Sequence, residues 1–305
     1  MCNSITNNCK FNLFAILLFF ILLNPNLSGQ SDSTKINPSR IFIVNASTIG
    51  GLGGSYYYMK NAWWSETKNN FHFDKGPDQT YALNLDKYGH FFGGLVLSEV
   101  YQGSLRWAGM KEEKAIWYGA VLGIVLHMGI ELKDGYAPYW GFSTMDLVSG
   151  SFGACIPVVN YYFPKSKSVG MKFSYFKEYD TYWKLERQRN KKPYKYSWQD
   201  DYVNQTYWFS FDLSQYNKLE VLSIPKWLCI AIGVGLDNTQ FLNNTNTKTG
   251  GNLEYYIAID YNTTRLLKNW DSSFGKKVKN ILKYIKLPAP TIRISPSFEF
   301  YPFYL

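Results

Sequence analysis

The spacing of apolar residues changes from helical to alternating near residue 165, and this change limits the possible folds more than any other feature of the chain. Before that point, apolar and small residues recur every three or four positions, as on one face of a helix. After it, apolar and polar residues alternate over short runs, as in strands with one dry face and one wet face. The sequence therefore predicts an α+β fold, with an antiparallel helical bundle followed by an antiparallel β-rich half.

Residues 1–29 have the layout of a secretory signal peptide. One early lysine, Lys10, precedes an apolar run over residues 11–23, and helix-breaking and small residues follow before Gln30. The apolar run is shorter than the ~20 residues that a bilayer-spanning helix needs. We therefore expect the protein to be exported, and an uncleaved N-terminal anchor is the alternative.

The rest of the chain divides into a helical unit over residues 30–164 and a β-rich half over residues 165–305. The helical unit begins with a predicted short strand at residues 40–44, a glycine-rich turn at 50–54 and a helix candidate at 55–65. Three longer helices follow, and turn residues and capping residues mark their ends. We predict them over residues 84–106, 111–133 and 143–163.

Alternating residues predict strands in the second half, and one amphipathic helix interrupts them. This helix, near residues 274–286, has apolar residues on one side and lysines on the other. It is a candidate for lying on an anionic membrane surface, although docking on the sheet is the more common use of such a stripe. The strands are fewer than the ~8 that a membrane barrel needs, so we expect a packed antiparallel sheet. We predict strands at residues 206–213, 227–236, 253–261 and 291–301.

Ionisable residues lie at the start of the first long helix, the end of the second and the start of the third. They are Asp86 and His90, then Glu131, then Asp146. Short connections make neighbouring helices antiparallel, which brings these three places to one end of the bundle. Because unpaired charges in apolar surroundings are costly, the sequence predicts that the four side chains form one cluster.

Small residues at four-residue intervals support this packing. In the second long helix they lead to His127 and Glu131, and in the third the repeat continues from Asp146. Such stripes let a neighbouring backbone approach closely. The small residues are Ala115, Gly119 and Gly123 in the second helix, and Gly150 and Ala154 in the third.

Some of these ionisable residues also have a purely structural interpretation. Asp146 lies three residues after Ser143, as in a capping box, and Asp86 in a first helical turn interacts favourably with the helix dipole. His127 is interpreted as a satisfied interior histidine. Glu131 and His90 are harder to explain in this way, and we expect them to be partners.

The charge balance bears on binding partners. The sequence has 32 basic and 23 acidic residues, a net charge of +9, with the excess mainly over residues 165–195 and 265–293. For an exported protein this favours an anionic lipid or glycolipid surface over nucleic acid, with solvated lysine-rich faces as the alternative. The glycine cluster at 50–54 fits neither a dinucleotide-binding nor a phosphate-binding loop, so we expect no cofactor. Standard metal-binding spacings such as Cys-x-x-Cys are missing, and metal binding and the oligomeric state are left open.

Several motifs of the helical unit occur together: Asp86-Lys87 with His90-Phe91, Glu131 with Asp134, and the run from Trp140 to Ser143 followed by Asp146. On these residues, the segment from about residue 83 to 163 resembles the YfiM family, small exported bacterial proteins of unknown function that are often lipoproteins, and more distantly the VanZ-like membrane proteins. Residues 201–208 and 286–291 look like the longer members of the family. The resemblance implies a location in the cell envelope, in the periplasm or at the periphery of the outer membrane, and it brings no established reaction. Unlike the lipoprotein members, this chain has no cysteine directly after its first apolar run.

Two functions of different classes fit these residues. The first, which we prefer, is a non-enzymatic envelope protein in which the cluster has a structural or binding role. The second is a lipid- or glycan-directed hydrolase or transferase, with His90 as general base or metal ligand, Asp86 orienting it, and Glu131 with Asp146 supplying acid chemistry or further ligands. A sealed, mutually paired cluster favours the first function, and a cluster at the floor of an open pocket favours the second.

Overall fold

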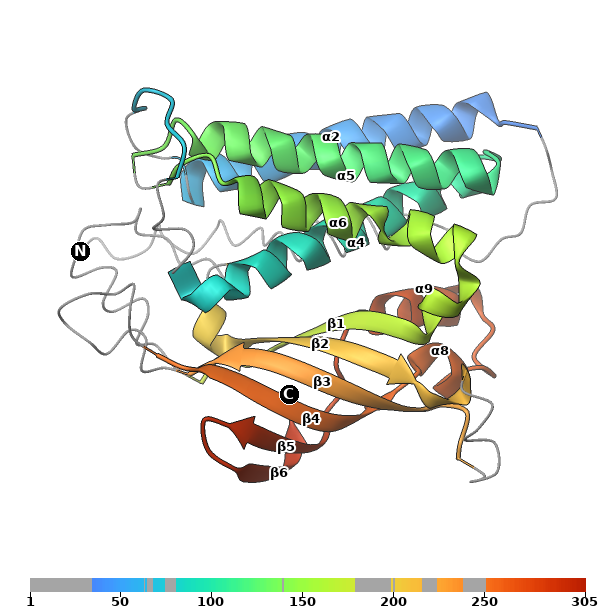
Figure 1. The fold of residues 1–305 in the computed structure, drawn as a ribbon. Helices are drawn as coiled ribbons and strands as arrows, with labels where there is room; N and C mark the ends of the chain where they lie inside the picture. The colour runs from blue at the N-terminus through green and yellow to red at the C-terminus, as the bar shows by residue number, and fades with distance from the viewer. Residues whose placement is uncertain are drawn as a thin grey trace, which may run out of the picture.

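The structure is a computed structural model in which helices lie on one side of a curled sheet (Figure 1). It describes residues 35–62, 64, 68–74, 81–138, 140–178, 199, 201–215, 224–237 and 251–305. The predicted signal peptide over residues 1–29 lies outside these described residues.

The long helices come first in the chain and the strands follow, which confirms the α+β fold. Among the described residues, the long helices are α2 (Pro38–Ala62), α4 (Leu85–Trp107), α5 (Glu112–Asp134) and α6 (Thr144–Tyr162). Two shorter helices, α8 (Thr263–Leu266) and α9 (Ser273–Leu282), lie between the fourth and fifth strands. Single 3₁₀ turns are η1 (Tyr81–Asn84), η2 (Pro164–Ser168), η4 (Tyr202–Asn204) and η5 (Leu213–Gln215).

The sheet is a six-stranded antiparallel meander, in which strands that follow one another in the chain are neighbours. This order is what short antiparallel connections produce. The strands are β1 (Val169–Tyr175), β2 (Gln205–Asp212), β3 (Leu228–Leu236), β4 (Leu253–Tyr261), β5 (Ala289–Ser295) and β6 (Glu299–Tyr304).

The three predicted bundle helices are confirmed almost to the residue as α4, α5 and α6, which pack against one another. Ser143 caps α6 as expected, because its Oγ accepts a hydrogen bond of 3.1 Å from the backbone N–H of Asp146. Asn84 makes no such side-chain bond and instead has a left-handed backbone, with φ of 65°. The start of α4 is therefore set by a turn and not by a side-chain cap.

The predicted strand at residues 40–44 is wrong, because α2 runs through it and through the glycine-rich turn at 50–54. Ile41 and Val44, three residues apart, share one helix face and pack against Leu105 of α4 and Ala108, the residue directly after it. A short apolar run has no periodicity of its own, so packing against α4 decides its conformation. Gly50 and the other glycines lower the intrinsic helix propensity by ~1 kcal/mol each without preventing the helix.

The small residues of α6 are in direct contact with α4. A Cβ atom added to Gly94 would lie 2.1 Å from the carbonyl oxygen of Gly150, and one added to Gly153 would lie 1.9 Å from the carbonyl oxygen of Phe91. In α5, a Cβ atom on Gly119 would lie 2.6 Å from the carbonyl oxygen of Ser98. The predicted close backbone approach is therefore confirmed, and it holds the ionisable end of the bundle together.

Two glycine substitutions of opposite sign test this packing. We expect Gly94→Ala to lower the free energy of unfolding by about 3 kcal/mol, because the added methyl group meets backbone atoms that cannot move aside. Gly129→Ala in α5 has open space around it and should raise the same quantity by about 0.5–1 kcal/mol through helix propensity. Urea unfolding followed by circular dichroism measures both. Equal effects of the two substitutions would contradict the close approach of α4 and α6.

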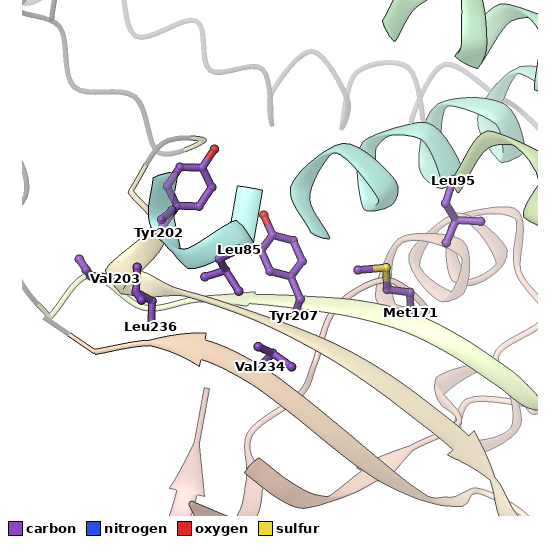
Figure 2. Close-up of a cluster of buried hydrophobic side chains, with 9 residues drawn as sticks. Leu85, Leu95, Met171, Tyr202, Val203, Tyr207, Val234 and Leu236 are labelled. Atoms are coloured by element: carbon purple, nitrogen blue, oxygen red, sulfur yellow. The ribbon is translucent and has the colours of Figure 1, made fainter. Parts of the chain in front are cut away.

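A shared hydrophobic core joins the bundle to the sheet. Leu85 and Leu95 of α4 point toward the sheet (Figure 2) and pack with residues of β1, β2 and β3. The sheet residues of this core are Met171, Tyr207, Val234 and Leu236. The core fixes α4, which carries two of the four candidate residues, against the sheet.

The sheet curls until its last strand reaches its second. The ring of Tyr304 in β6 lies 5.8 Å from that of Trp208 in β2 and 4.7 Å from that of Tyr256 in β4. The predicted strand over residues 291–301 is wrong as a single element, because the chain turns at residues 296–298 to form β5 and β6. Pro296 has no N–H to donate to a sheet ladder, which explains the break.

The isoleucines of β3 and β4 lie on the exposed face of the sheet, and the alanines between them, Ala231 and Ala258, lie on the buried face. Ile230 pairs with Ile259 and Ile232 pairs with Ile257, and all four side chains are exposed. On the other face of β4, Tyr256 and Asp260 are buried. Alternation therefore located β2, β3 and β4, but it did not reveal which face of β4 is buried.

Helix α9 forms where the basic amphipathic helix was predicted, and it docks on the bundle. Ile281 packs against Val96 and Val100 of α4. Lys283 forms an ion pair with Glu99, and Lys286, four residues beyond the helix, is fully buried. The lysines of residues 274–286 consequently do not form one solvated face.

Candidate functional site

Three helices bring the four predicted residues to one end of the bundle. Asp86 and His90 come from α4, Glu131 from α5 and Asp146 from α6. One ligand atom of each of His90, Glu131 and Asp146 lies within 4.8 Å of the others. The carboxylates are almost completely buried, with Glu131 only 1% exposed. We call these four residues together with Lys87 the bundle-end cluster.

Lys87 links two carboxylates of the bundle-end cluster. Its ammonium Nζ lies 2.9 Å from Oδ2 of Asp86 and 2.7 Å from Oδ1 of Asp146. The ion pair with Asp146 joins the start of α4 to the start of α6. Sequence analysis did not choose Lys87 as a site residue, although it lies beside Asp86 in the matching motif. A lysine in a first helical turn ordinarily extends into solvent, so residue type alone did not reveal its role.

Glu131 connects the end of α5 to the start of α6. Its Oε2 accepts a hydrogen bond of 2.9 Å from the backbone N–H of Ser143, the cap residue of α6. A carboxylate at a helix N-terminus is favoured by the helix dipole as well as by this bond. The capping role of Ser143 and Asp146 is therefore compatible with the cluster, because the start of α6 makes both the cap hydrogen bond and the contact with Glu131.

His90 is the most accessible member of the predicted set, with 22% of its side chain exposed. Its Nε2 lies 3.7 Å from Oδ2 of Asp146, so a protonated His90 forms an ion pair with that carboxylate. Nε2 and Oδ2 are too far apart for a direct hydrogen bond. The structure thus places Asp146 at the centre of the cluster, between the ammonium of Lys87 and the ring of His90.

His127 is a buried histidine whose ring contacts that of His90. Its Nδ1 is 2.9 Å from the carbonyl oxygen of Gly123, and the two imidazole rings are 5.6 Å apart. Burial, reinforced by the neighbouring His90, lowers the pKa of His127 to about 4. The ring is therefore neutral near pH 7, in agreement with a satisfied interior histidine.

The segment at residues 71–74 packs along residues 140–142 beside this end of the bundle. Phe73 and Phe142 form a parallel bridge, and Nε2 of His72 lies 2.6 Å from the carbonyl oxygen of Trp140. Asp134, paired with Glu131 in the sequence motif, accepts a hydrogen bond of 2.6 Å from Nε1 of Trp64. Aromatic residues thus surround the loop that precedes α6.

The donor set of His90, Glu131 and Asp146 suits a divalent transition-metal ion. One imidazole nitrogen and two carboxylate oxygens are ligands that zinc and similar metals accept. Lys87 and Asp86 would then lie in the shell around the ligands, where hydrogen bonds orient them.

A cavity of about 560 Å³ lies between the bundle and the sheet. Its lining includes Phe91, Glu99 and Lys172, and it does not include any of the four predicted site residues. The bundle-end cluster is thus not the floor of this cavity.

A second buried charged group lies inside the curled sheet, and sequence analysis missed it. Asp260 is fully buried, with Lys172 Nζ 2.7 Å from its Oδ2 and Lys286 Nζ 4.0 Å from its Oδ1. Lys286 also donates to the carbonyl oxygen of Ile259 at 2.9 Å, and burial lowers its pKa to about 8. The three residues come from β1, β4 and the loop after α9, so only the tertiary structure brings them together.

Comparison with known proteins adds a family to this geometry. Residues 73–162 match a family model described as "Predicted periplasmic lipoprotein (DUF2279)". Neither the curated proteins nor the solved structures gave a match. The match confirms that the protein is exported and periplasmic, as expected from the sequence. The finer resemblances to YfiM and to VanZ stay predictions.

The matched residues, which we call the DUF2279 segment, contain the whole bundle-end cluster. They include α4, α5 and α6 and end at the last residue of α6. The sheet and its buried charges lie outside the match. The cluster is therefore a feature of the part of the chain that is similar to the family.

Proposed function

We propose that this periplasmic protein is non-enzymatic and that the bundle-end cluster locks the three helices of the DUF2279 segment into one arrangement. The observation that carries the proposal is the position of Lys87, whose ammonium binds Asp86 and Asp146 at the same time. Glu131 completes the lock, because its carboxylate accepts a hydrogen bond from the backbone N–H of Ser143, the cap residue of α6. Every pair of bundle helices thus meets in either the glycine contacts or these charged contacts.

Buried ionic groups of this kind favour one arrangement over others more than they add stability. Removing one partner leaves a buried charge uncompensated and costs roughly 3–5 kcal/mol, so alternative packings that separate the partners are strongly disfavoured. Glycines make the close contacts between these helices, and the charged contacts fix how far each helix is shifted along its neighbours. The hydrolase or transferase remains a hypothesis from the sequence.

A second candidate function, divalent-metal binding, is favoured by the convergence of His90, Glu131 and Asp146 within 4.8 Å. The separation of 3.7 Å between His90 Nε2 and Asp146 Oδ2 is close to the ~3.4 Å between two ligands of a tetrahedral zinc ion. A bound ion would replace the direct ion pair and strengthen the same helix contacts.

One set of unfolding measurements tests both candidates. We expect Glu131→Gln to lower the free energy of unfolding by about 1–3 kcal/mol, because the neutral amide accepts the Ser143 N–H less strongly. Urea unfolding is measured after dialysis against EDTA and again with added Zn²⁺ or Mn²⁺. Glu113→Gln, at an exposed position of α5, is the matched control: its amide oxygen still accepts the exposed Tyr162 hydroxyl, so the variant should stay within about 0.5 kcal/mol of wild type.

The pattern of results separates the two functions. A pure lock gives the same loss for Glu131→Gln with and without metal. Metal binding gives a wild-type protein that is stabilised by the added ion and a His90→Gln variant that is not. A Glu131→Gln variant as stable as wild type that nevertheless fails to maintain envelope integrity would contradict the lock and favour ligand binding or catalysis.

A further inference from the structure

The helices of the DUF2279 segment carry their polar residues inside and large apolar residues outside. Buried positions include His127, Glu131 and Ser98, whereas the outer face of α5 is formed by exposed apolar side chains. Soluble proteins seldom expose apolar patches of this extent unless the patch binds something. The exposed side chains are Trp117, Tyr118, Val121, Val125, Met128 and Leu132 on α5, and Met145, Val148, Phe152 and Val159 on α6.

The exposed residues of α5 form one continuous stripe at helical spacing. Trp117 and Tyr118 begin the stripe, and the others follow at intervals of three or four residues to Leu132, so they lie on the same side of the helix. By length and composition α5 is apolar enough to cross a membrane, and only 39% of its most apolar window is buried. Helix α5 is therefore buried on one face only.

The uncharged part of α5 suits a helix lying in a lipid interface more than one spanning the bilayer. Residues 115–130 contain no charge and correspond to a helix of ~24 Å, shorter than the ~30 Å hydrocarbon core. The opposite face of α5 packs on α4 and α6, as the protein-facing side of an interfacial helix does. Trp117 and Tyr118, at one end of the stripe, are residues that prefer the membrane interface.

Basic residues surround one end of these helices. Contacts bring the ends together, because Arg40 donates to the carbonyl oxygen of Trp107 at 3.0 Å and Tyr162 donates to Glu113 Oε1 at 3.1 Å. The acidic residues flanking this end, Glu112 and Glu113, are outnumbered by basic ones, and an excess of positive charge attracts anionic headgroups. The basic residues are Lys35, Arg40, Arg106, Lys111, Lys114, Lys165 and Lys167.

We propose that the outer stripe of α5, extended by α6, is a lipid-contacting surface that lies along an anionic phospholipid bilayer, its apolar side chains among the acyl chains and the basic helix ends at the headgroups. The occupant is lipid because a long, uncharged apolar stripe and flanking basic and aromatic residues occur together. This surface is on the outside of the bundle and does not depend on the bundle-end cluster.

Vesicle flotation of the purified full-length protein tests the proposal. The probes are vesicles of phosphatidylcholine alone and of phosphatidylcholine with phosphatidylglycerol. We expect the wild type to float with both and to bind the anionic vesicles several-fold more strongly. Val121→Asp with Val125→Asp places two charges in the stripe and should reduce the vesicle affinity at least ~10-fold, since ~1.4 kcal/mol already gives that factor.

A matched variant on the sheet controls for loss of any exposed apolar patch. Ile257→Asp with Ile259→Asp lies on the exposed face of β4, where these isoleucines are 45% and 41% exposed, compared with 53% and 58% for Val121 and Val125. This variant should float like the wild type. Val121→Ser with Val125→Ser, a milder change, should weaken binding less than the aspartates while leaving the unfolding midpoint unchanged.

Three results would overturn the proposal. The first is a wild type that binds neither vesicle. The second is a loss of flotation in the sheet variant with normal flotation of the α5 variants. The third is a wild type that is dimeric without lipid and becomes monomeric in the α5 variants, since the stripe would then bind a second copy of this chain.

Discussion

Replacing Lys87 by methionine is expected to lower the free energy of unfolding by about 3–5 kcal/mol. Methionine keeps most of the volume and removes the charge that Asp86 and Asp146 share at 2.9 and 2.7 Å. Both carboxylates are buried, so solvent does not replace the lost ammonium. Chemical denaturation at pH 7, analysed for midpoint and slope together, gives the size of the loss.

Two further variants make this result interpretable. Lys279→Met removes an ion pair with Asp271, whose side chain is 75% exposed, and should cost no more than about 0.5 kcal/mol. Asp146→Asn introduced into the Lys87→Met protein should restore ~1 kcal/mol or more, because it removes one of the uncompensated charges. Strict additivity of the Lys87 and Asp146 substitutions would mean that the two residues do not interact, and the lock would be disproved.

Asp260→Asn is expected to be similarly damaging, at about 3–5 kcal/mol, although it lies outside the DUF2279 segment. The substitution leaves the ammonium groups of Lys172 and Lys286 together in the interior of the sheet. The matched control is Asp271→Asn, which alters an exposed aspartate and should stay within about 0.5 kcal/mol of wild type. Thermal unfolding and urea unfolding should give the same order of stabilities.

The pH dependence of this loss has a defined sign. Burial lowers the pKa of Lys286 to about 8 in the folded protein, and Asp260 partly opposes this shift. The unfolded chain holds the same proton up to about pH 10.4, so unfolding takes up a proton above pH 8 and the folded state gains stability as the pH rises. Without Asp260 the pKa of Lys286 in the folded protein falls further, and the folded state begins to gain stability at a lower pH.

The difference in free energy of unfolding between Asp260→Asn and wild type should therefore narrow between pH 7 and pH 9.5. The narrowing is about 1 kcal/mol for each unit by which Asp260 raises the pKa of Lys286. The comparison uses the difference between variant and wild type, which cancels groups that titrate alike in both. A deficit that stays constant over this range would show that the charge of Lys286 does not depend on Asp260.

The bundle was predictable because each of its signals is local. Ser143 marks the start of α6 through its own hydroxyl, and residues four apart in α4 and α5 define the faces that meet. The convergence of Asp86, Glu131 and Asp146 followed from helix order alone, since short connections leave little choice of direction.

The parts that sequence analysis missed depend on contacts between distant segments. Ile41 and Val44 are strand-like as residues, and only the surface of α4 makes their segment a helix. Glu131 binds a backbone N–H of Ser143, and a backbone group has no signature in residue type. Lys172 and Asp260 are drawn together by the curl of the sheet, which alternation does not encode.

Lys286 makes the docking of α9 and the interior of the sheet a single cooperative unit. The side chain enters the sheet four residues after α9 ends, and its ammonium is held by the carbonyl oxygens of Ile259 and Leu287. For α9 to detach from the bundle, the chain would have to withdraw this ammonium and break the buried charged group. Slow exchange of the α9 amides, at rates close to those of β4, is the behaviour that such a tether imposes.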